Sequence, residues 1–115
     1  MEQGNRAQGT QQDASTVFVS YSREDRQRAL PIIKIIEEAG FIVWWDGLLE
    51  GGERFARITE EALERAKAVV VLWSAASTKS HWVHDEATVG RDRQRLVPIS
   101  IDGSEPPLGF RQFQV

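Results

Sequence analysis

Four short apolar runs, separated by segments with helical spacing of apolar residues, constrain this chain more than any other feature. The runs fall at 17–20, 41–45, 69–73 and 96–101, and each is rich in β-branched or aromatic residues, as buried strands are. Between them apolar residues recur every three or four positions, which predicts helices over about 23–39, 55–66 and 82–93. Strict alternation of strands and helices predicts a doubly wound α/β fold, a parallel sheet with helices on both faces.

The two ends of the chain differ from this pattern. Residues 1–15 contain almost no large apolar side chain, which predicts a flexible N-terminal tail, and residues 16–115 then form one domain. The sequence stops at Val115 soon after Pro106 and Pro107, so we expect the last helix of such a fold to be missing. The domain is then C-terminally abbreviated or a fragment of a longer protein.

Composition excludes several function classes. The formal net charge is −3 and the charges are interleaved, so no basic stripe is available for a nucleic-acid backbone. The chain has no cysteine, which excludes disulfides, thiolate metal sites and a cysteine nucleophile. No apolar run reaches the roughly 20 residues that a membrane-spanning helix needs. We therefore expect a cytoplasmic protein that binds neither nucleic acid nor membrane.

Polar residues follow three of the predicted strands, at 20–23, 46–52 and 74–86. Ligands of doubly wound folds bind beyond the carboxyl ends of the strands, so the functional site is expected there. Within the first segment, Ser22 and Asp25 have the spacing of a helix-capping pair.

Three segments, taken in order, resemble the Toll/interleukin-1 receptor (TIR) domain family. Residues 17–22 with Glu24 and Asp25 are similar to the opening strand box of that family. Residues 43–46, followed by Leu49, Gly52 and Phe55, resemble the second strand and the BB loop of its microbial members. Trp82 and Glu86 stand at the spacing of the family's Trp-x-x-x-Glu signature. The resemblance covers residues 17–110 and implies the flavodoxin-like fold of TIR domains.

The resemblance also implies a function. Members that are enzymes cleave NAD+ between nicotinamide and ribose, releasing nicotinamide and ADP-ribose or a cyclic form, and the signature glutamate, here Glu86, is the essential carboxylate. NAD+ is then a substrate, and no cofactor is expected. Other TIR domains bind one another and catalyse nothing, so a non-catalytic signalling module is the alternative. Both interpretations imply self-association with other TIR domains. In the enzymes, self-association is the step that activates NAD+ cleavage.

The chemistry of NAD+ cleavage suits a single carboxylate. Nicotinamide leaves a cationic pyridinium as a neutral molecule, so the leaving group needs no general acid, whereas the oxocarbenium-like ribose needs an anion beside it. Glu86 fits this role, and Trp82, four residues earlier on the predicted helix, shares its face and can line the same pocket. The plainer alternatives are a solvated carboxylate for Glu86 and core packing for Trp82.

Further substrate-binding candidates follow the ends of the strands. Four of them also have a structural alternative: Ser22 as a helix cap, Arg23 as an exposed residue of a first helical turn, and Asp46 and Ser74 as turn residues. If the second strand is regular, Trp44 and Trp45 point to opposite faces, and only the second is a candidate. The set comprises Ser20, Tyr21, Ser22, Arg23, Trp45, Asp46 and Ser74.

Three other site types are disfavoured. His81, His84, Asp85 and Glu86 diverge around a helix, and no second ligand cluster accompanies them, so we expect no metal. No glycine-rich phosphate-binding motif occurs. A phospho-receiver domain would need an aspartate at the end of the third strand, where Trp73 and Ser74 stand.

Overall fold

The computed structural model describes residues 16–45 and 53–110 of the chain. The predicted tail over residues 1–15 and the loop over residues 46–52, which includes Asp46, lie outside the described residues.

A four-stranded parallel sheet forms the centre of the molecule, which confirms the predicted α/β fold. Its strand order is β2-β1-β3-β4, so the chain reverses its winding direction between β1 and β3. The strands are β1 (Thr16–Ser20), β2 (Ile42–Trp44), β3 (Ala68–Trp73) and β4 (Leu96–Ser100).

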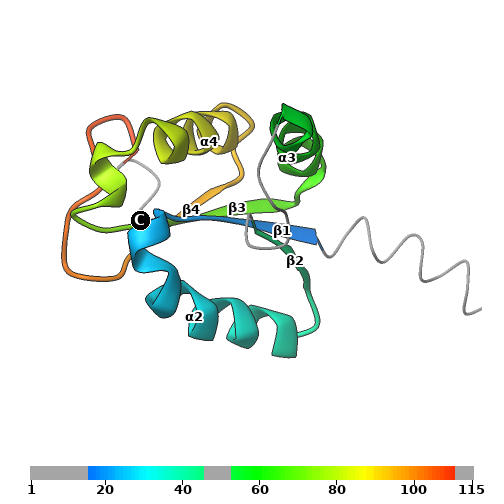
Figure 1. The fold of residues 1–115 in the computed structure, drawn as a ribbon, viewed down its shortest axis with the longest axis horizontal. Coiled ribbons are helices and arrows are strands. Elements are labelled where there is room, and N and C mark those ends of the chain that lie inside the picture. Colours follow the sequence, from blue (N-terminus) through cyan, green and yellow to red (C-terminus); the bar gives the residue numbers. More distant parts are fainter. Residues whose placement is uncertain (1–15, 46–52, 111–115) are drawn as a thin grey trace, which may run out of the picture.

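Helices cover both faces of this sheet, as the alternating pattern predicts. One face carries α2 (Arg26–Glu38), and the other carries α3 (Glu53–Arg65) and α4 (His81–Asp92) (Figure 1). Two short 3-10 helices, η1 (Arg23–Asp25) and η3 (Ser77–Lys79), follow the ends of β1 and β3. Both lie at the carboxyl edge of the sheet, where ligands of doubly wound folds bind.

The third strand, β3, anchors both halves of the core. Val69, Val71 and Trp73 pack against the helices α3 and α4. Val70 and Leu72 point to the other face and pack against α2. A strand covered on both faces excludes water from its whole length, which explains why its sequence is uninterruptedly apolar.

The two tryptophans at the end of β2 lie on opposite faces of the sheet, as the period of a strand requires. Trp44 stacks on Phe18, with ring centroids 5.0 Å apart, in the layer of α3 and α4. Trp45 packs in the layer of α2, with its ring centroid 6.4 Å from that of Tyr21. This side-chain alternation confirms the prediction made from the sequence.

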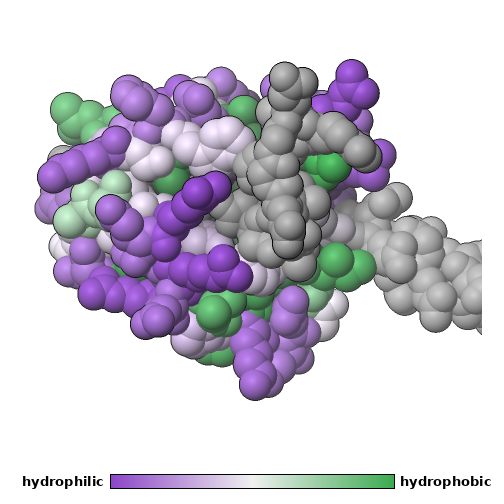
Figure 2. Space-filling view, viewed as in Figure 1, coloured by the Kyte–Doolittle hydropathy of each residue, from purple (hydrophilic) through white to green (hydrophobic). Residues whose placement is uncertain are grey.

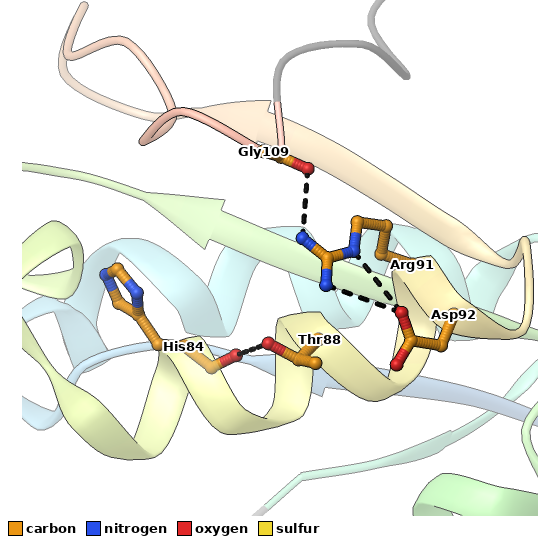
Figure 3. Close-up of polar contacts among 5 residues, drawn as sticks. All are labelled: His84, Thr88, Arg91, Asp92 and Gly109. Carbon is orange, nitrogen blue, oxygen red and sulfur yellow. Dashed lines mark hydrogen bonds and ion pairs between the residues drawn. The ribbon is translucent and has the colours of Figure 1, made fainter.

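The chain after β4 returns to α4 without forming a helix between Ile101 and Phe110. Phe110 is buried against Trp73, with ring centroids 5.4 Å apart. Arg91 of α4 lies over the Phe110 ring at 5.2 Å and donates to the Gly109 carbonyl at 3.4 Å (Figure 3). The segment thus packs the Phe110 side chain against β3 and contacts α4 through Arg91.

The visible surface is predominantly hydrophilic, with apolar residues in small separate patches (Figure 2). Within the described ranges, no helix combines the length and the apolar character needed to cross a bilayer.

Close packing of α4 on β3 makes Gly90 a sensitive position. A Cβ at Gly90 would lie 2.9 Å from the Val69 Cβ, which is fixed to the strand backbone. We expect Gly90→Ala to lower the free energy of unfolding by about 1–2 kcal/mol, because the clash outweighs the higher helix propensity of alanine. Urea denaturation measures this change.

The double variant Gly90→Ala with Val69→Ala is the matched test. Val69→Ala removes the two γ-methyls, which would lie 3.2 and 3.3 Å from the added Cβ, and keeps the Cβ of residue 69. The destabilisation of the double variant should be smaller than the sum of the two single effects, because the strand can yield once these methyls are gone. Simple additivity would show that the contacts with the two γ-methyls do not contribute.

Candidate functional site

An open cleft of about 920 Å³ lies at the carboxyl edge of the sheet, between the segments that follow β1 and β3. Its size suits a nucleotide-sized ligand. One wall comes from residues that follow β1, and the other from the segment between β3 and α4. The described residues that line the cleft are Tyr21, Ser22, Arg23, Glu24, Ala75, Ala76, Lys79, Ser80 and Trp82.

The cleft carries charge of both signs on its rim. Arg23 and Lys79 stand on opposite walls, both with exposed side chains, and Glu24 is exposed beside Arg23. Two cations facing one cleft suit an anionic group such as a phosphate. Tyr21, Ser22 and Arg23 therefore lie where the sequence predicts, whereas Glu24, Lys79 and Ser80 had not been identified.

Helix α4 begins at this cleft. The Ser80 hydroxyl accepts a hydrogen bond from the Val83 N–H at 3.2 Å, which makes Ser80 the N-cap. Trp82, in the first turn, lines the cleft and is 40% exposed. An indole with 40% of its surface exposed is not plain core packing, so part of the Trp82 surface is accessible from the cleft.

Glu86 lies one turn deeper than Trp82. It belongs to the stripe of α4 that faces the sheet, together with Val83, Ala87 and Gly90, and only 5% of it is exposed. Glu86 is not one of the described residues that line the cleft. The Glu86 carboxylate therefore lies in a layer shielded from water. It is about 6 Å along the helix axis from Trp82, whose indole lines the cleft.

Ser20 points into the same layer as Glu86. Side chains alternate along β1, so Ser20 shares the face of Phe18, which packs with Val83 and Ala87 of α4. The Ser20 hydroxyl is buried and has no hydrogen-bond partner among the residues that the structure describes. Such a group is uncommon in native proteins and marks a place where a ligand oxygen or a water can bind.

Two predicted site residues lie apart from the cleft surface. Trp45 is half-buried on the α2 face, beside Tyr21, and the Arg26 guanidinium lies 5.5 Å from its ring centroid. Ser74 is 1% exposed and lies beneath the cleft, because its hydroxyl is turned towards the buried Asp25. The expectation that Ser74 lines the pocket is corrected accordingly.

Asp25 is a site residue that the sequence analysis missed. Its spacing from Ser22 suggests helix capping, but neither side chain makes a capping hydrogen bond. Instead the Asp25 carboxylate accepts a hydrogen bond from the Ser74 hydroxyl, which is paired in turn with Ser77. Nothing in the local sequence distinguishes a carboxylate that caps its own helix from one that reaches across the sheet.

A second carboxylate, that of Asp102, binds the segment after β3 from the solvent-exposed side. Asp102, after β4, accepts the N–H of Ala75 at 2.9 Å and that of Ser104 at 2.9 Å. The hydrogen bond from the Ala75 N–H, followed by those from Ser104, lowers the pKa of Asp102 below its ordinary value of 3.8. Ala75, a lining residue, is therefore tied to the loop after β4.

In the described part of the chain, no group of three or more His, Cys, Asp or Glu side chains is placed to hold a metal ion.

The lowered pKa of Asp102 predicts a stability change in acid. The ionised Asp102 carboxylate contributes its full stabilisation of the folded state above pH 3.8. This stabilisation is lost as the pH falls through the lower pKa that Asp102 has in the folded state. We expect the amide resonances of Ala75 and Ser104 to shift together, with a common midpoint below 3.8, in an NMR pH titration.

Asp102→Asn provides the control for this titration. In that variant the shared acid transition should disappear, and its stability difference from the parent protein should narrow as the pH falls. Separate midpoints for the two amides would contradict the assignment to Asp102.

Comparison with protein-family models places the chain among known proteins. A family model described as TIR domain matches residues 17–115. A search of curated proteins finds no match.

Proposed function

This chain belongs to the TIR domain family, and we propose that it is an NAD+ glycohydrolase activated by self-association, with Glu86 as its essential carboxylate. The observation that carries the proposal is the burial of Glu86, with 5% exposed, one helical turn from Trp82 at the cleft. Asp25 and Glu86 are the buried carboxylates of the described residues. We assign the chemistry to Glu86 because it stands on α4, one turn from Trp82, which lines the cleft.

In the proposed reaction, the bond between the ribose anomeric carbon and the nicotinamide nitrogen breaks, and its electron pair stays on nicotinamide. The positive charge that develops on the ribose is stabilised by the Glu86 carboxylate, whose effect is strongest where water is excluded. A water oxygen then bonds to the anomeric carbon and a proton is released, which gives ADP-ribose. Attack by a group of the substrate itself would give the cyclic product instead.

The cleft offers contacts for the rest of NAD+. Arg23 and Lys79 suit the diphosphate of NAD+, because they are exposed cations on the two walls of the cleft. Trp82 lines the cleft with 40% of its surface exposed, and an indole is a side chain against which a planar ring can pack. The Ser20 hydroxyl, buried and unbonded within the described ranges, is available to a ribose oxygen.

The burial of Glu86 is the physical reason to include self-association in the proposal. With 5% of Glu86 exposed, the single chain does not present the carboxylate to a substrate, so α4 or its surroundings must shift for turnover. A neighbouring subunit that favours the shifted state supplies the necessary free energy. TIR domains generally interact with one another, so the protein's own copies are the proposed partners.

We expect Glu86→Gln and Glu86→Ala to abolish nicotinamide release from NAD+ by artificially clustered protein, with a loss of about 100-fold or more, because a neutral side chain does not stabilise the ribose cation. Liquid chromatography of the products measures the rate and separates ADP-ribose from a cyclic form. Circular dichroism checks that the variants keep their fold.

Asp85→Asn is the matched control, since Asp85 is an exposed acid one position earlier on the same helix. It should keep wild-type activity. Full activity of Glu86→Ala would refute the assigned site. Absence of turnover in the clustered wild-type protein would instead favour the non-catalytic interaction module.

A further inference from the structure

We propose that Asp25 is a positioning residue, which sets the width of the cleft by binding the segment after β3 to the segment after β1. The proposal rests on the proposed function, because it concerns how the same cleft holds NAD+. Asp25 and its partners Ser74 and Ser77 form what we term the cleft latch.

The latch is a buried network of hydrogen bonds beneath the cleft. Asp25 is 8% exposed, Ser74 is 1% exposed and Ser77 is fully buried. The Ser74 hydroxyl donates to Asp25 Oδ2, and the Ser77 N–H donates to the Ser74 hydroxyl at 3.0 Å. The Ser74 N–H donates to the Ser77 hydroxyl at 2.7 Å. A hydrogen bond to a charged acceptor in a buried setting is among the stronger polar interactions of a protein.

The cleft latch lies just beyond the last paired residues of β1 and β3. Parallel pairing between β1 and β3 ends at Ser20 and Val71, so backbone ladder bonds do not reach the cleft walls. Asp25 immediately follows Arg23 and Glu24 of one wall, and Ser74 immediately precedes Ala75 and Ala76 of the other. The Asp25–Ser74 bond therefore joins the walls across 49 residues of sequence.

The orientation of Asp25 argues against a purely local role. Asp25 occupies the N-cap position of α2, where a carboxylate ordinarily accepts a bond from a free N–H of the first turn. It makes no such side-chain bond. Its carboxylate binds Ser74 instead, so its polar contact links the segment after β1 to the segment after β3.

A latch of this kind acts on substrate binding more than on the chemical step. The lining cations Arg23 and Lys79 stand on the two walls that it joins, whereas Glu86 stands on α4, outside the latch segments. Loosening the latch should weaken contacts that NAD+ makes equally in its ground and transition states. Such a change raises KM and leaves kcat nearly unchanged.

The test is a graded series at Asp25, assayed for NAD+ cleavage with clustered protein. Asp25→Ala should raise KM for NAD+ about tenfold, with kcat within about twofold of wild type. Asp25→Asn keeps an acceptor oxygen and should be intermediate. Glu38→Gln is the matched control, because it removes one negative charge from an exposed position at the far end of α2 and should leave both constants unchanged.

Hydrogen exchange supplies a readout that does not depend on activity. In Asp25→Ala, the amides of residues 75–80 should exchange about tenfold faster, while those of β3 and of residues 86–90 keep their wild-type rates. If Asp25→Ala does not fold, Asp25→Asn and Ser74→Ala provide the same measurement. Ser74→Ala removes the hydroxyl that donates to Asp25 and leaves the Asp25 side chain in place.

The outcomes separate the two proposals. If clustered wild-type protein releases no nicotinamide, the proposed function fails and the exchange rates alone decide on the latch. Unchanged exchange of residues 75–80 would overturn the latch. In an active protein, an unchanged KM, or a fall in kcat with KM preserved, would overturn it as well.

Discussion

The parallel pairing of β1 with β3 is the constraint on which the rest of the structure depends. This pairing places two crossover connections on opposite sides of one point at the carboxyl edge, so the chain leaves that point in two directions and a cleft remains between them. It is maintained by the burial of β3 on both faces, in which Val71, Leu72 and Trp73 are completely shielded from water. Hydrophobic packing directly beneath the cleft thus determines that a cleft exists.

Two buried carboxylates at this edge have different surroundings and different consequences. Asp25 is bonded to Ser74 and, in our proposal, acts on the shape of the cleft. Glu86 lies under α4 beside the cleft and, in our proposal, acts on the substrate. A buried carboxylate is costly unless other groups compensate it, so a fold that keeps two at one edge devotes part of its stability to that edge.

The candidate site could be predicted in part, because the strand-end rule is a property of sequence order. Tyr21, Ser22 and Arg23 follow β1 directly, and Trp82 begins the helix after β3, so all four lie at the cleft. The rule gives the edge of the sheet but not the direction in which a loop turns. Ser74 follows a strand equally closely, yet the 3-10 turn at Ser77 draws its hydroxyl beneath the surface.

The sequence by itself determined the elements, their parallel arrangement and the family, because hydrophobic period and strand order depend on neighbouring residues. The placement of Trp44 and Trp45 on opposite faces of the sheet followed from the two-residue period of a strand. Only the tertiary structure decided that Asp25 bonds to Ser74 instead of capping its helix, and that Glu86 is enclosed in a dry layer. Both are contacts between segments distant in sequence, whose geometry exists only once the sheet and its helices have packed.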